Sequence, residues 1–463
     1  MSAPEDLVER IRLRLDESFA GIGEVVAELR PADVADLVNQ LTRQEAAAVM
    51  SMLSVPRAVE VLDQPTLNRR GAILEQMEPG RAAQVLDGLS SDERTFVVRD
   101  MGEVARRRLL PKLSAEARAE VERLLQYPAQ SAGGIMTTEF VRLEPAWTVA
   151  ECLRHVRQVA REKESIYACY VMEPASGRLL GSVSLRDLVM AELEQPVEKV
   201  MRRKPVTVAA LDDREAVAGK IAKYNLLAVP VLEQDGSVVG FVTVDDVIDV
   251  MIEEGTEDAL RMGAVEPGAV DEPYATAPFW TLVGRRAGWL LILFLGEMLT
   301  ATVMGRFEQE IARAVVLALF VPLIISSGGN SGSQAASLII RALAVGELRI
   351  RDWWRVMRRE IFSGLVLGSI LGFVGFLRIS AWSLVSPEAY GPHWPLIALT
   401  VWISLIGVVL WGTLAGSMLP LLLKRAGLDP AVSSAPFVAT LVDVTGLFIY
   451  FQVAARILSG TLL

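Results

Sequence analysis

The sequence predicts a multidomain protein: an all-α N-terminal superhelix, a tandem pair of α/β repeats, an acidic connecting helix and a five-span α-helical membrane domain. Charged residues are frequent up to about Tyr274, and apolar residues dominate from about Trp280 onward. A repeat of constant spacing lies in the middle of the chain. A chain of 463 residues is long enough for several domains. The predicted boundaries are 1–130, 131–199, 200–252, 253–276 and 277–463.

Composition excludes several function classes. The net charge of −10 argues against a nucleic-acid partner, which requires a basic surface, and it suits cations. Two cysteines, Cys152 and Cys169, are too few for a disulfide scaffold and indicate a reducing compartment. The N-terminus shows no secretory signal pattern, so we expect no cleaved leader. With only two histidines, zinc chemistry and triad hydrolysis are not expected, and we predict no enzyme activity.

Residues 1–130 show apolar residues at helical spacing with charge on the opposite face. The stretch "RAVEVLDQ" at Arg57 recurs as "RAAQVLDG" at Arg81. Such loose repetition of short helical units predicts a small superhelix.

Two stretches in the middle of the chain repeat each other: "GRLLGSVSLRDLVM" and "GSVVGFVTVDDVIDVM". The matched positions, 59 residues apart, are Gly181 with Gly240, Ser184 with Thr243, and Asp187 with Asp246. Each unit opens with a methionine, Met136 or Met201. A strand, a glycine turn, a second strand and an Asp-capped helix together resemble a tandem pair of CBS domains, with CBS 1 at 131–199 and CBS 2 at 200–252.

The aspartate that begins the last helix of each repeat has two interpretations. It is an N-cap, or it binds the ribose of an adenine nucleotide, as the corresponding residue of CBS pairs often does. The resemblance makes Tyr170, Arg186 and Asp187 candidate nucleotide-binding residues, with ATP as a candidate ligand. The segment that follows Asp246 is an acidic helix, so Asp246 has a different expected role.

An acidic segment connects the second repeat to the first apolar run. Its acids recur every three or four residues, so several share one helical stripe: Asp245, Asp246, Asp249, Glu253, Glu254, Glu257 and Asp258. A solvated helix face is one interpretation. The other is that divalent cations, held by oxygen ligands, neutralise the stripe against another acidic surface. The N-terminal stretch "LSSDERTFVVRDMGE", with Asp92, is a candidate for that surface.

Five segments are long and apolar enough to span a bilayer: 283–304, 314–344, 362–385, 395–423 and 431–460. An odd number of spans places the termini on opposite sides. Arginines gather between the second and third spans, and Lys424 and Arg425 lie between the fourth and fifth. The positive-inside rule therefore predicts a cytoplasmic N-terminal part and an external Leu463, in the plasma (inner) membrane.

Polar and small residues interrupt the second span in "SSGGNSGSQ". Irregular polar backbone at membrane depth is tolerated only where protein buries it or where it lines a water-filled cavity, so we expect such backbone here. Small residues also mediate helix packing, which would account for the glycines. It would not account for Asn330 and Gln334, which lie on one helical face and are candidate pore-lining residues.

A single acid, Asp443, stands in the last apolar run, "FVATLVDVTGLFIYF". An ionisable residue there is costly, by about 2.5–3.5 kcal/mol or more, and is seldom incidental. A partner arginine would give it a structural role, whereas Thr440 and Thr445 beside it suit a cavity wall. Two copies of Asp443 across a two-fold axis could hold a largely hydrated Mg²⁺.

Three segments, "YPAQSAGGIMTTEFV", "SSGGNSGSQAASLIIRAL" and "GLDPAVSSAPFVATLVDVTGLFIYF", resemble signature segments of the MgtE family of magnesium channels and transporters. The resemblance covers almost the whole chain. It implies a homodimer in the lipid bilayer, with one Mg²⁺-selective pore at the dimer axis. It also implies closure when intracellular Mg²⁺ bridges the N-terminal domain, the CBS pair and a "plug" helix.

The resemblance assigns roles to individual residues. Asp443 is the pore carboxylate, and it joins Asn330, Gln334 and Thr440, which the pattern of polar residues in the spans already selects as pore candidates. The implied sensor and plug acids are Asp92, Glu215, Asp246, Asp249, Glu254, Glu257, Asp258 and Asp429. Asn225 stands where some relatives would carry an acid.

The alternative function is a proton- or Na⁺-coupled divalent-cation exchanger with broader selectivity for Mn²⁺ or Co²⁺, because a membrane aspartate can carry protons or Na⁺. The sequence leaves open the ranking of Mg²⁺, Mn²⁺, Co²⁺ and Ca²⁺. It also leaves open which acids share each ion and whether the CBS pair binds nucleotide.

Overall fold

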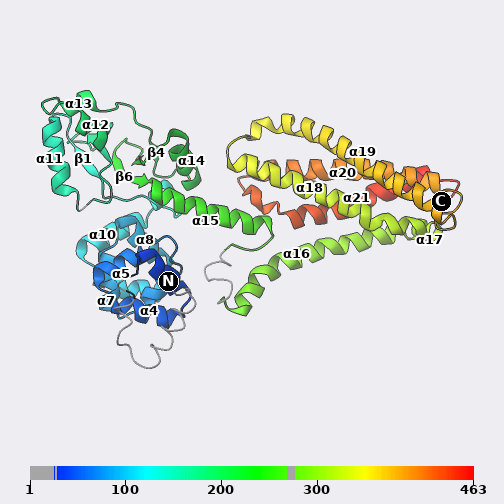
Figure 1. The fold of residues 1–463 in the computed structure, drawn as a ribbon, viewed down its shortest axis with the longest axis horizontal. Helices are drawn as coiled ribbons and strands as arrows, with labels where there is room; N and C mark the ends of the chain where they lie inside the picture. The colour runs from blue at the N-terminus through cyan, green and yellow to red at the C-terminus, as the bar shows by residue number, and fades with distance from the viewer. Residues whose placement is uncertain (1–25, 27–28, 162, 268–276, 463) are drawn as a thin grey trace. The chain divides into compact units, whose positions relative to one another are not determined.

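The computed structural model describes residues 26, 29–161, 163–267 and 277–462. The chain divides into two compact units (Figure 1). The first contains residues 1–254 and 271–276, and the second contains 255–270 and 277–463. The last part of the expected connector, 268–276, lies outside the described residues.

Short helices form the beginning of the first unit, as the apolar periods predict. They are α3 (Pro31–Asn39), α4 (Arg43–Met52), α5 (Val55–Leu62), α6 (Arg70–Gln76), α7 (Pro79–Asp87), α8 (Ser91–Asp100), α9 (Glu103–Leu109) and α10 (Ala115–Leu124), with the 3-10 turn η1 (Leu110–Lys112). Side-chain caps define several starts: Thr42 and Glu45 form a capping box at α4, and Ser54 caps α5. The two recurring stretches match α5 and α7, whose alanines and leucines are buried in a common core.

Two similar three-stranded sheets follow. The first repeat contains η2 (Ala132–Gly134), β1 (Val141–Leu143), α11 (Val149–Val159), β2 (Ala168–Met172), β3 (Leu179–Ser184) and α12 (Leu185–Met190). The second contains α13 (Val197–Val200), β4 (Val208–Ala209), α14 (Arg214–Tyr224), β5 (Ala228–Leu232), β6 (Val238–Thr243) and α15 (Val244–Met262). In each sheet the first strand pairs parallel with the second, and the second pairs antiparallel with the third.

The matched glycines of the repeat occupy equivalent positions. Gly181 pairs with Val171, and Gly240 pairs with Val231. A Cβ at Gly181 would lie 2.7 Å from the sulfur of Met201, and a Cβ at Gly240 would lie 2.8 Å from that of Met136. Each repeat therefore receives the opening methionine of the other, which explains why both units need glycine at this position.

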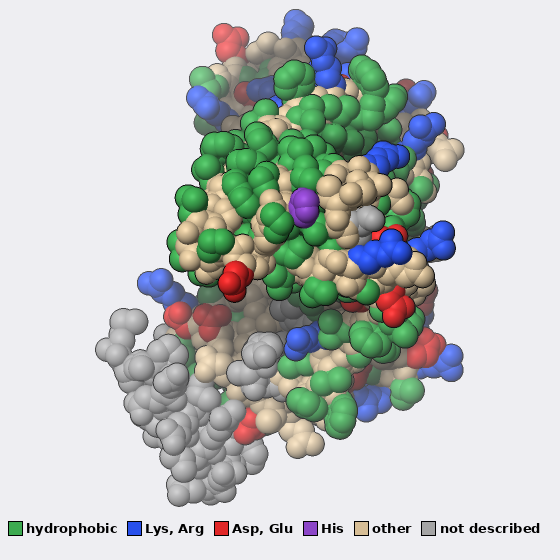
Figure 2. Space-filling view, turned by 90° about the vertical axis from the view of Figure 1, so that its right-hand side faces the viewer, with side chains coloured by type: hydrophobic (Ala, Val, Ile, Leu, Met, Phe, Trp, Pro, Cys, Tyr) green, Lys and Arg blue, Asp and Glu red, His purple; other side chains and the backbone are tan. Residues whose placement is uncertain are grey.

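The second unit contains the apolar half. Its helices are α16 (Phe279–Arg306), α17 (Glu308–Arg313), α18 (Val321–Ala344), α19 (Trp353–Val385), α20 (Trp394–Arg425) and α21 (Ala435–Ile457), with 3-10 turns η3 (Val315–Phe320), η4 (Ile350–Asp352) and η5 (Pro430–Val432). Five of these segments are long and apolar enough to cross a membrane, as predicted. Their exposed apolar side chains form continuous hydrophobic areas on the face shown in Figure 2.

The expectation of irregular backbone in the second span is wrong. Helix α18 runs without interruption from Val321 to Ala344, through the whole "SSGGNSGSQ" stretch. Its glycines allow close helix packing instead: a Cβ at Gly332 would lie 2.9 Å from the carbonyl oxygen of Gly412 on α20. Helix α20 packs against α18, α19 and α21, and α16 contacts α21. No residue of α16 is fully buried.

Candidate functional site

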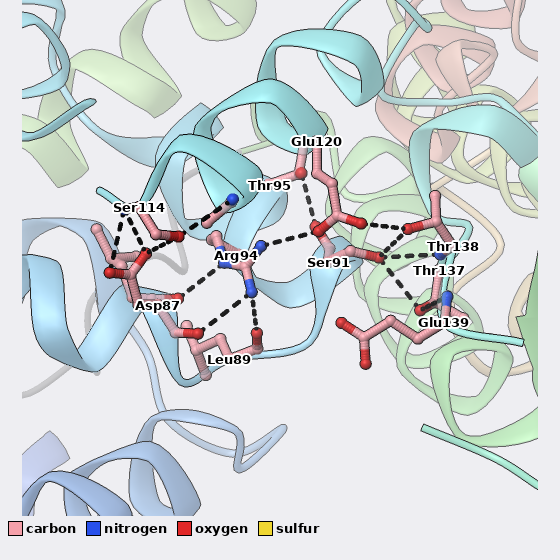
Figure 3. Close-up of polar contacts among 12 residues, drawn as sticks. Asp87, Leu89, Ser91, Arg94, Thr95, Ser114, Glu120, Thr137, Thr138 and Glu139 are labelled. Atoms are coloured by element: carbon pink, nitrogen blue, oxygen red, sulfur yellow. Dashed lines mark hydrogen bonds and ion pairs between the residues drawn. The ribbon is translucent and has the colours of Figure 1, made fainter. Parts of the chain in front are cut away.

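The N-terminal end of α8 is fixed to the start of the first repeat by a hydroxyl network (Figure 3). Ser91 Oγ lies 3.2 Å from Thr137 Oγ1 and accepts from the backbone N–H of Thr138 at 2.9 Å. Thr138 also donates to Glu120, and Arg94 donates to the other oxygen of that carboxylate at 3.2 Å. Asp92, the next residue along α8, is therefore held close to the repeats.

Three acids from separate segments converge at this place. One carboxylate oxygen from each of Asp92, Glu164 and Asp246 lies within 4.8 Å of the other two. Asp92 is only 7% exposed, and its Oδ1 is buried with no hydrogen-bond partner, as is Glu164 Oε2. Unsatisfied buried carboxylate oxygens are costly unless a cation or a proton compensates them.

The pKa values in this cluster are displaced upward. Burial raises the pKa of Asp92 above its ordinary range. Burial, followed by the negative charge of Asp92, raises the pKa of Glu164 to about 9. Burial and the charges of Asp92 and Glu164 raise the pKa of Asp246 well above its usual value. Three oxygen ligands that cannot all remain ionised alone form a suitable site for a hard divalent cation such as Mg²⁺.

The two aspartates matched by the repeat differ in what they do. Asp187 is the N3 residue of a capping box at the start of α12, and Ser184 is the N-cap, so Asp187 stabilises the helix start from within the first turn rather than as the N-cap itself. Asp246 likewise accepts from the backbone N–H of Thr243 at 3.2 Å, so it caps α15. Only Asp246 also belongs to the acidic cluster. Cap and ligand are compatible roles because a carboxylate has two oxygens.

A cavity of about 280 Å³ lies beside the cluster. Asp92, Asp246 and Asp249 line it, together with Arg70 and Arg214. Burial raises the pKa of Asp249 to about 6, although Arg70 opposes the shift. Of the predicted sensor acids, the structure thus brings Asp92, Asp246 and Asp249 to one place. Glu164 was missed, because a single glutamate in a loop gives no sequence signal.

The other predicted sensor acids lie elsewhere, and most pair with arginines. Glu254 accepts from Arg214 at 2.6 Å, and Glu253 accepts from the same guanidinium at 2.9 Å. Glu257 and Asp429 both pair with Arg261. Glu215 and Asp258 lie in α14 and α15 and do not belong to the three-acid cluster. Asn225 is the left-handed cap residue of α14, with φ of 51°, a conformation that asparagine tolerates well.

The candidate nucleotide-binding residues differ in how exposed they are. Tyr170 is 1% exposed and packs edge-on against Phe140. Its ring is therefore not accessible for stacking on a nucleotide base. Tyr167 is 63% exposed, and its carbonyl accepts from the backbone of Leu185, next to the exposed Arg186. An exposed tyrosine, Tyr167, thus lies beside Arg186 and Asp187 in the fold.

In the membrane half, Asp443 lies on α21 near α18 and α16. A Cβ at Gly329 would lie 3.6 Å from Asp443 Oδ1, so α18 approaches this carboxylate without obstruction. Within the described residues no lysine or arginine forms an ion pair with Asp443, which argues against the structural interpretation. Asn330 and Gln334 are exposed on α18, and Asn330 donates to Ser326 at 3.3 Å.

A second membrane acid, Glu297, was missed in the sequence. It lies on α16, the helix that contacts α21, where Asp443 lies. Glu297 and Thr440 are the polar residues of an otherwise apolar groove of about 650 Å³ between α16 and α21. The criterion that identifies Asp443, an acid within an apolar run, applies equally to Glu297 in "LLILFLGEMLT".

Family models match most of the chain. Residues 29–130 match the MgtE intracellular N domain, residues 132–194 and 197–253 match CBS domains, and residues 321–453 match the MgtE divalent cation transporter. A magnesium transporter MgtE from Thermus thermophilus is 42% identical over 344 residues, which cover 74% of this chain and 73% of the relative.

The chain belongs to the MgtE family of magnesium transporters.

A Bacillus subtilis MgtE is 30% identical over 451 residues, covering 97% of both chains. Among solved structures, a cytosolic domain of the Mg²⁺ channel MgtE in complex with ATP is 35% identical, covers 52% of this chain and 99% of that chain, and gives a TM-score of 0.49. The family models and the curated relatives confirm the predicted family and fold class, and with the five long apolar helices they confirm a multi-pass membrane domain.

Proposed function

We propose that this MgtE-family protein is a Mg²⁺ channel for uptake across the plasma membrane, closed by intracellular Mg²⁺. The observation that carries the closure is the cluster of Asp92, Glu164 and Asp246. Its acids come from α8, from the loop after α11 and from the start of α15. A cation bound there joins three segments, and α15 continues toward the membrane half. Mg²⁺ favours the joined state by its higher affinity for it.

The permeation path is proposed to follow the polar groups of α18 and α21. Asn330 and Gln334 are exposed in a single chain, and Asp443 is partly exposed. Polar side chains do not face lipid without cost, so a second copy of the chain is the natural cover for them. In a two-fold dimer, two copies of Asp443 would hold a hydrated Mg²⁺, with Thr440 and Glu297 beside them.

The proposed orientation places the first unit in the cytoplasm and the C-terminus outside. It rests on arginines at the start of α19, where Arg355, Arg358 and Arg359 are exposed beside Trp353 and Trp354. Basic residues mark cytoplasmic ends, and tryptophans mark the membrane interface. An adenine nucleotide is proposed to bind at Tyr167, Arg186 and Asp187 and to shift the Mg²⁺ threshold by linkage.

Currents through membrane patches test the proposal, with cytoplasmic Mg²⁺ varied for wild type, Asp443→Ala and Glu164→Gln. We expect a wild-type Mg²⁺ current that closes as cytoplasmic Mg²⁺ rises. Asp443→Ala should abolish it, and Glu164→Gln should keep it but need more Mg²⁺ for closure. A Mg²⁺ current of full size in Asp443→Ala would refute the role of this residue in the pore.

A cation-coupled exchanger is the second candidate, favoured by one observation: two membrane acids, Glu297 on α16 and Asp443 on α21, lie on helices that contact each other. Paired acids in a membrane can carry protons as well as bind divalent ions. Uptake of Mg²⁺, Mn²⁺ and Co²⁺ into vesicles, with and without a proton or Na⁺ gradient, separates the two. Flux that requires the gradient identifies an exchanger, and flux that follows the Mg²⁺ gradient alone identifies a channel.

A further inference from the structure

Arg261 links the end of α15 to the turn before α21. Arg261 pairs with Glu257, one turn earlier on its own helix, and with Asp429, which precedes η5. The side chains of Arg261, Glu257 and Asp429 are 31%, 22% and 30% exposed, so the group is partly shielded from water. Asp429 is itself fixed, because it accepts from the backbone N–H of Ala431 at 2.8 Å.

Further contacts place the same segment against the membrane helices. Met262 packs against the core of the membrane half. The backbone N–H of Glu266 donates to the carbonyl of Arg285 on α16 at 3.2 Å, and Arg285 donates to the carbonyl of Pro267 at 3.0 Å. The end of α15 is therefore tied both to α16 and to the turn that leads into α21.

We propose that Arg261 is a positioning residue for gating: a tethered cation that keeps the end of α15 docked at the start of α21 without Mg²⁺. The inference deepens the proposed function and rests on it. A guanidinium bridges two carboxylates from different elements as a divalent ion would. Unlike a free ion, it is permanently charged and is part of the chain, so its presence at the site does not depend on the Mg²⁺ concentration. Glu257 and Asp429 therefore already have a cation.

The two ends of α15 then contribute to closure in different ways. Arg261 supplies a constant contribution to the closed state, and the Mg²⁺-dependent contribution comes from the acids at the other end of the helix. Those acids are Asp92, Glu164 and Asp246, and among the described residues one buried oxygen of Asp92 and one of Glu164 have no hydrogen-bond partner. Removing Arg261 should weaken closure without removing the response to Mg²⁺.

The test compares full-length wild type with Arg261→Gln in patches at varied cytoplasmic Mg²⁺. We expect the Mg²⁺ concentration for half-closure to rise about threefold or more, in line with a partly exposed ion pair. Arg358→Gln is the matched control, because it removes an exposed arginine of the same charge from α19. The double variant Arg261→Asp with Asp429→Arg should restore closure toward the wild-type concentration.

Two results would overturn the inference. An unchanged midpoint in Arg261→Gln means that the ion pair does not bias gating. A midpoint at lower Mg²⁺ means that Arg261 competes with Mg²⁺ for Glu257 and Asp429, the opposite of the proposed role.

Hydrogen exchange of the full-length protein in EDTA gives a readout that does not depend on transport. Amides of residues 255–263 should exchange faster in Arg261→Gln than in wild type or Arg358→Gln. Equal exchange would refute the tethered cation. Absence of wild-type Mg²⁺ current would instead refute the proposed channel, and hydrogen exchange would still decide whether Arg261 holds the helix.

Discussion

At the scale of single residues, Asp246 combines a local folding role with the proposed ion sensing. Its first role is local: its carboxylate accepts from the backbone N–H of Thr243 and stabilises the start of α15. Its position in a cluster with Asp92 and Glu164 suits the proposed second role, because three neighbouring carboxylates repel one another unless protons or a cation intervene. Stability in this region should therefore depend on pH and on Mg²⁺ together.

The pH dependence has a definite sign. Burial raises the pKa of Glu164 to about 9 in the folded state, above its ordinary value of 4.5. The folded state then binds more protons than the unfolded state between these values, so stability falls as pH rises through this window. In EDTA, we expect the thermal midpoint of the first unit's unfolding to fall between pH 6 and pH 9. Differential scanning calorimetry measures it, and a midpoint that rises with pH would contradict the assignment.

Saturating Mg²⁺ should reverse this loss, because the cation replaces the protons. Binding at about 100 times Kd adds about 2.7 kcal/mol to the folded state. We expect Mg²⁺ to raise the thermal midpoint of wild type at pH 8 and to have a much smaller effect on Glu164→Gln. Glu173→Gln, an exposed acid of the same repeat, is the control. An equal Mg²⁺ effect in Glu164→Gln and wild type would exclude Glu164 as a ligand.

Glu297 offers a test of the membrane path at the same scale. Its carboxylate attracts cations toward Asp443, so Glu297→Gln should lower the Mg²⁺ current by about tenfold, equivalent to about 1.4 kcal/mol. Glu308→Gln, an exposed acid in α17, should leave the current close to wild type. Patch currents at low cytoplasmic Mg²⁺ provide the measurement. If both variants conduct like wild type, Glu297 is not part of the path.

At the scale of elements, the small residues of α18 serve packing. Gly332 lies where a Cβ would come 2.9 Å from both the Gly412 carbonyl oxygen and Val438 Cγ1. Helices in a membrane gain much of their association energy from such close backbone approach. On the same helix the side-chain amides of Asn330 and Gln334 are exposed. Helix α18 therefore has a packing face and a separate polar face.

A pair of glycine substitutions tests this separation. Gly332→Ala should destabilise the membrane half by about 1–3 kcal/mol through overpacking. Gly288→Ala, on α16 with no atom near the added Cβ, should be neutral or stabilising by up to about 1 kcal/mol because alanine favours helix. Thermal denaturation in detergent measures both. A neutral Gly332→Ala would show that α18 and α20 do not need this close approach.

At the scale of the whole molecule, the proposed dimer would cover the polar groups of the membrane helices. Asn330 and Gln334 are exposed and Asp443 is partly exposed within one chain, and α16 has no fully buried residue. A two-fold assembly that covers these groups would create one ion path from two incomplete halves.

Cysteine cross-linking tests this assembly. Asp443→Cys, in a variant whose buried Cys152 and Cys169 are replaced by alanine, should form a covalent dimer on oxidation. Leu384→Cys, which is 83% exposed near the end of α19, should remain monomeric on denaturing gels. If Leu384→Cys cross-links and Asp443→Cys does not, the axis lies elsewhere.

The sequence by itself determined the elements whose signals are local. Apolar run lengths predicted five spans, helical periods predicted the N-terminal helices, and the 59-residue spacing predicted two equivalent repeats. Asp443 was also accessible to sequence reasoning, because the cost of an acid in an apolar run is a local property.

Only the tertiary structure decided which acids meet. Asp92, Glu164 and Asp246 are far apart in sequence, and folding converts them into one cluster. It likewise showed that Glu254, Glu257 and Asp429 are already paired with arginines and that Tyr170 is buried. The reason is physical: a residue's charge partners and its burial depend on long-range packing, which a single sequence does not record.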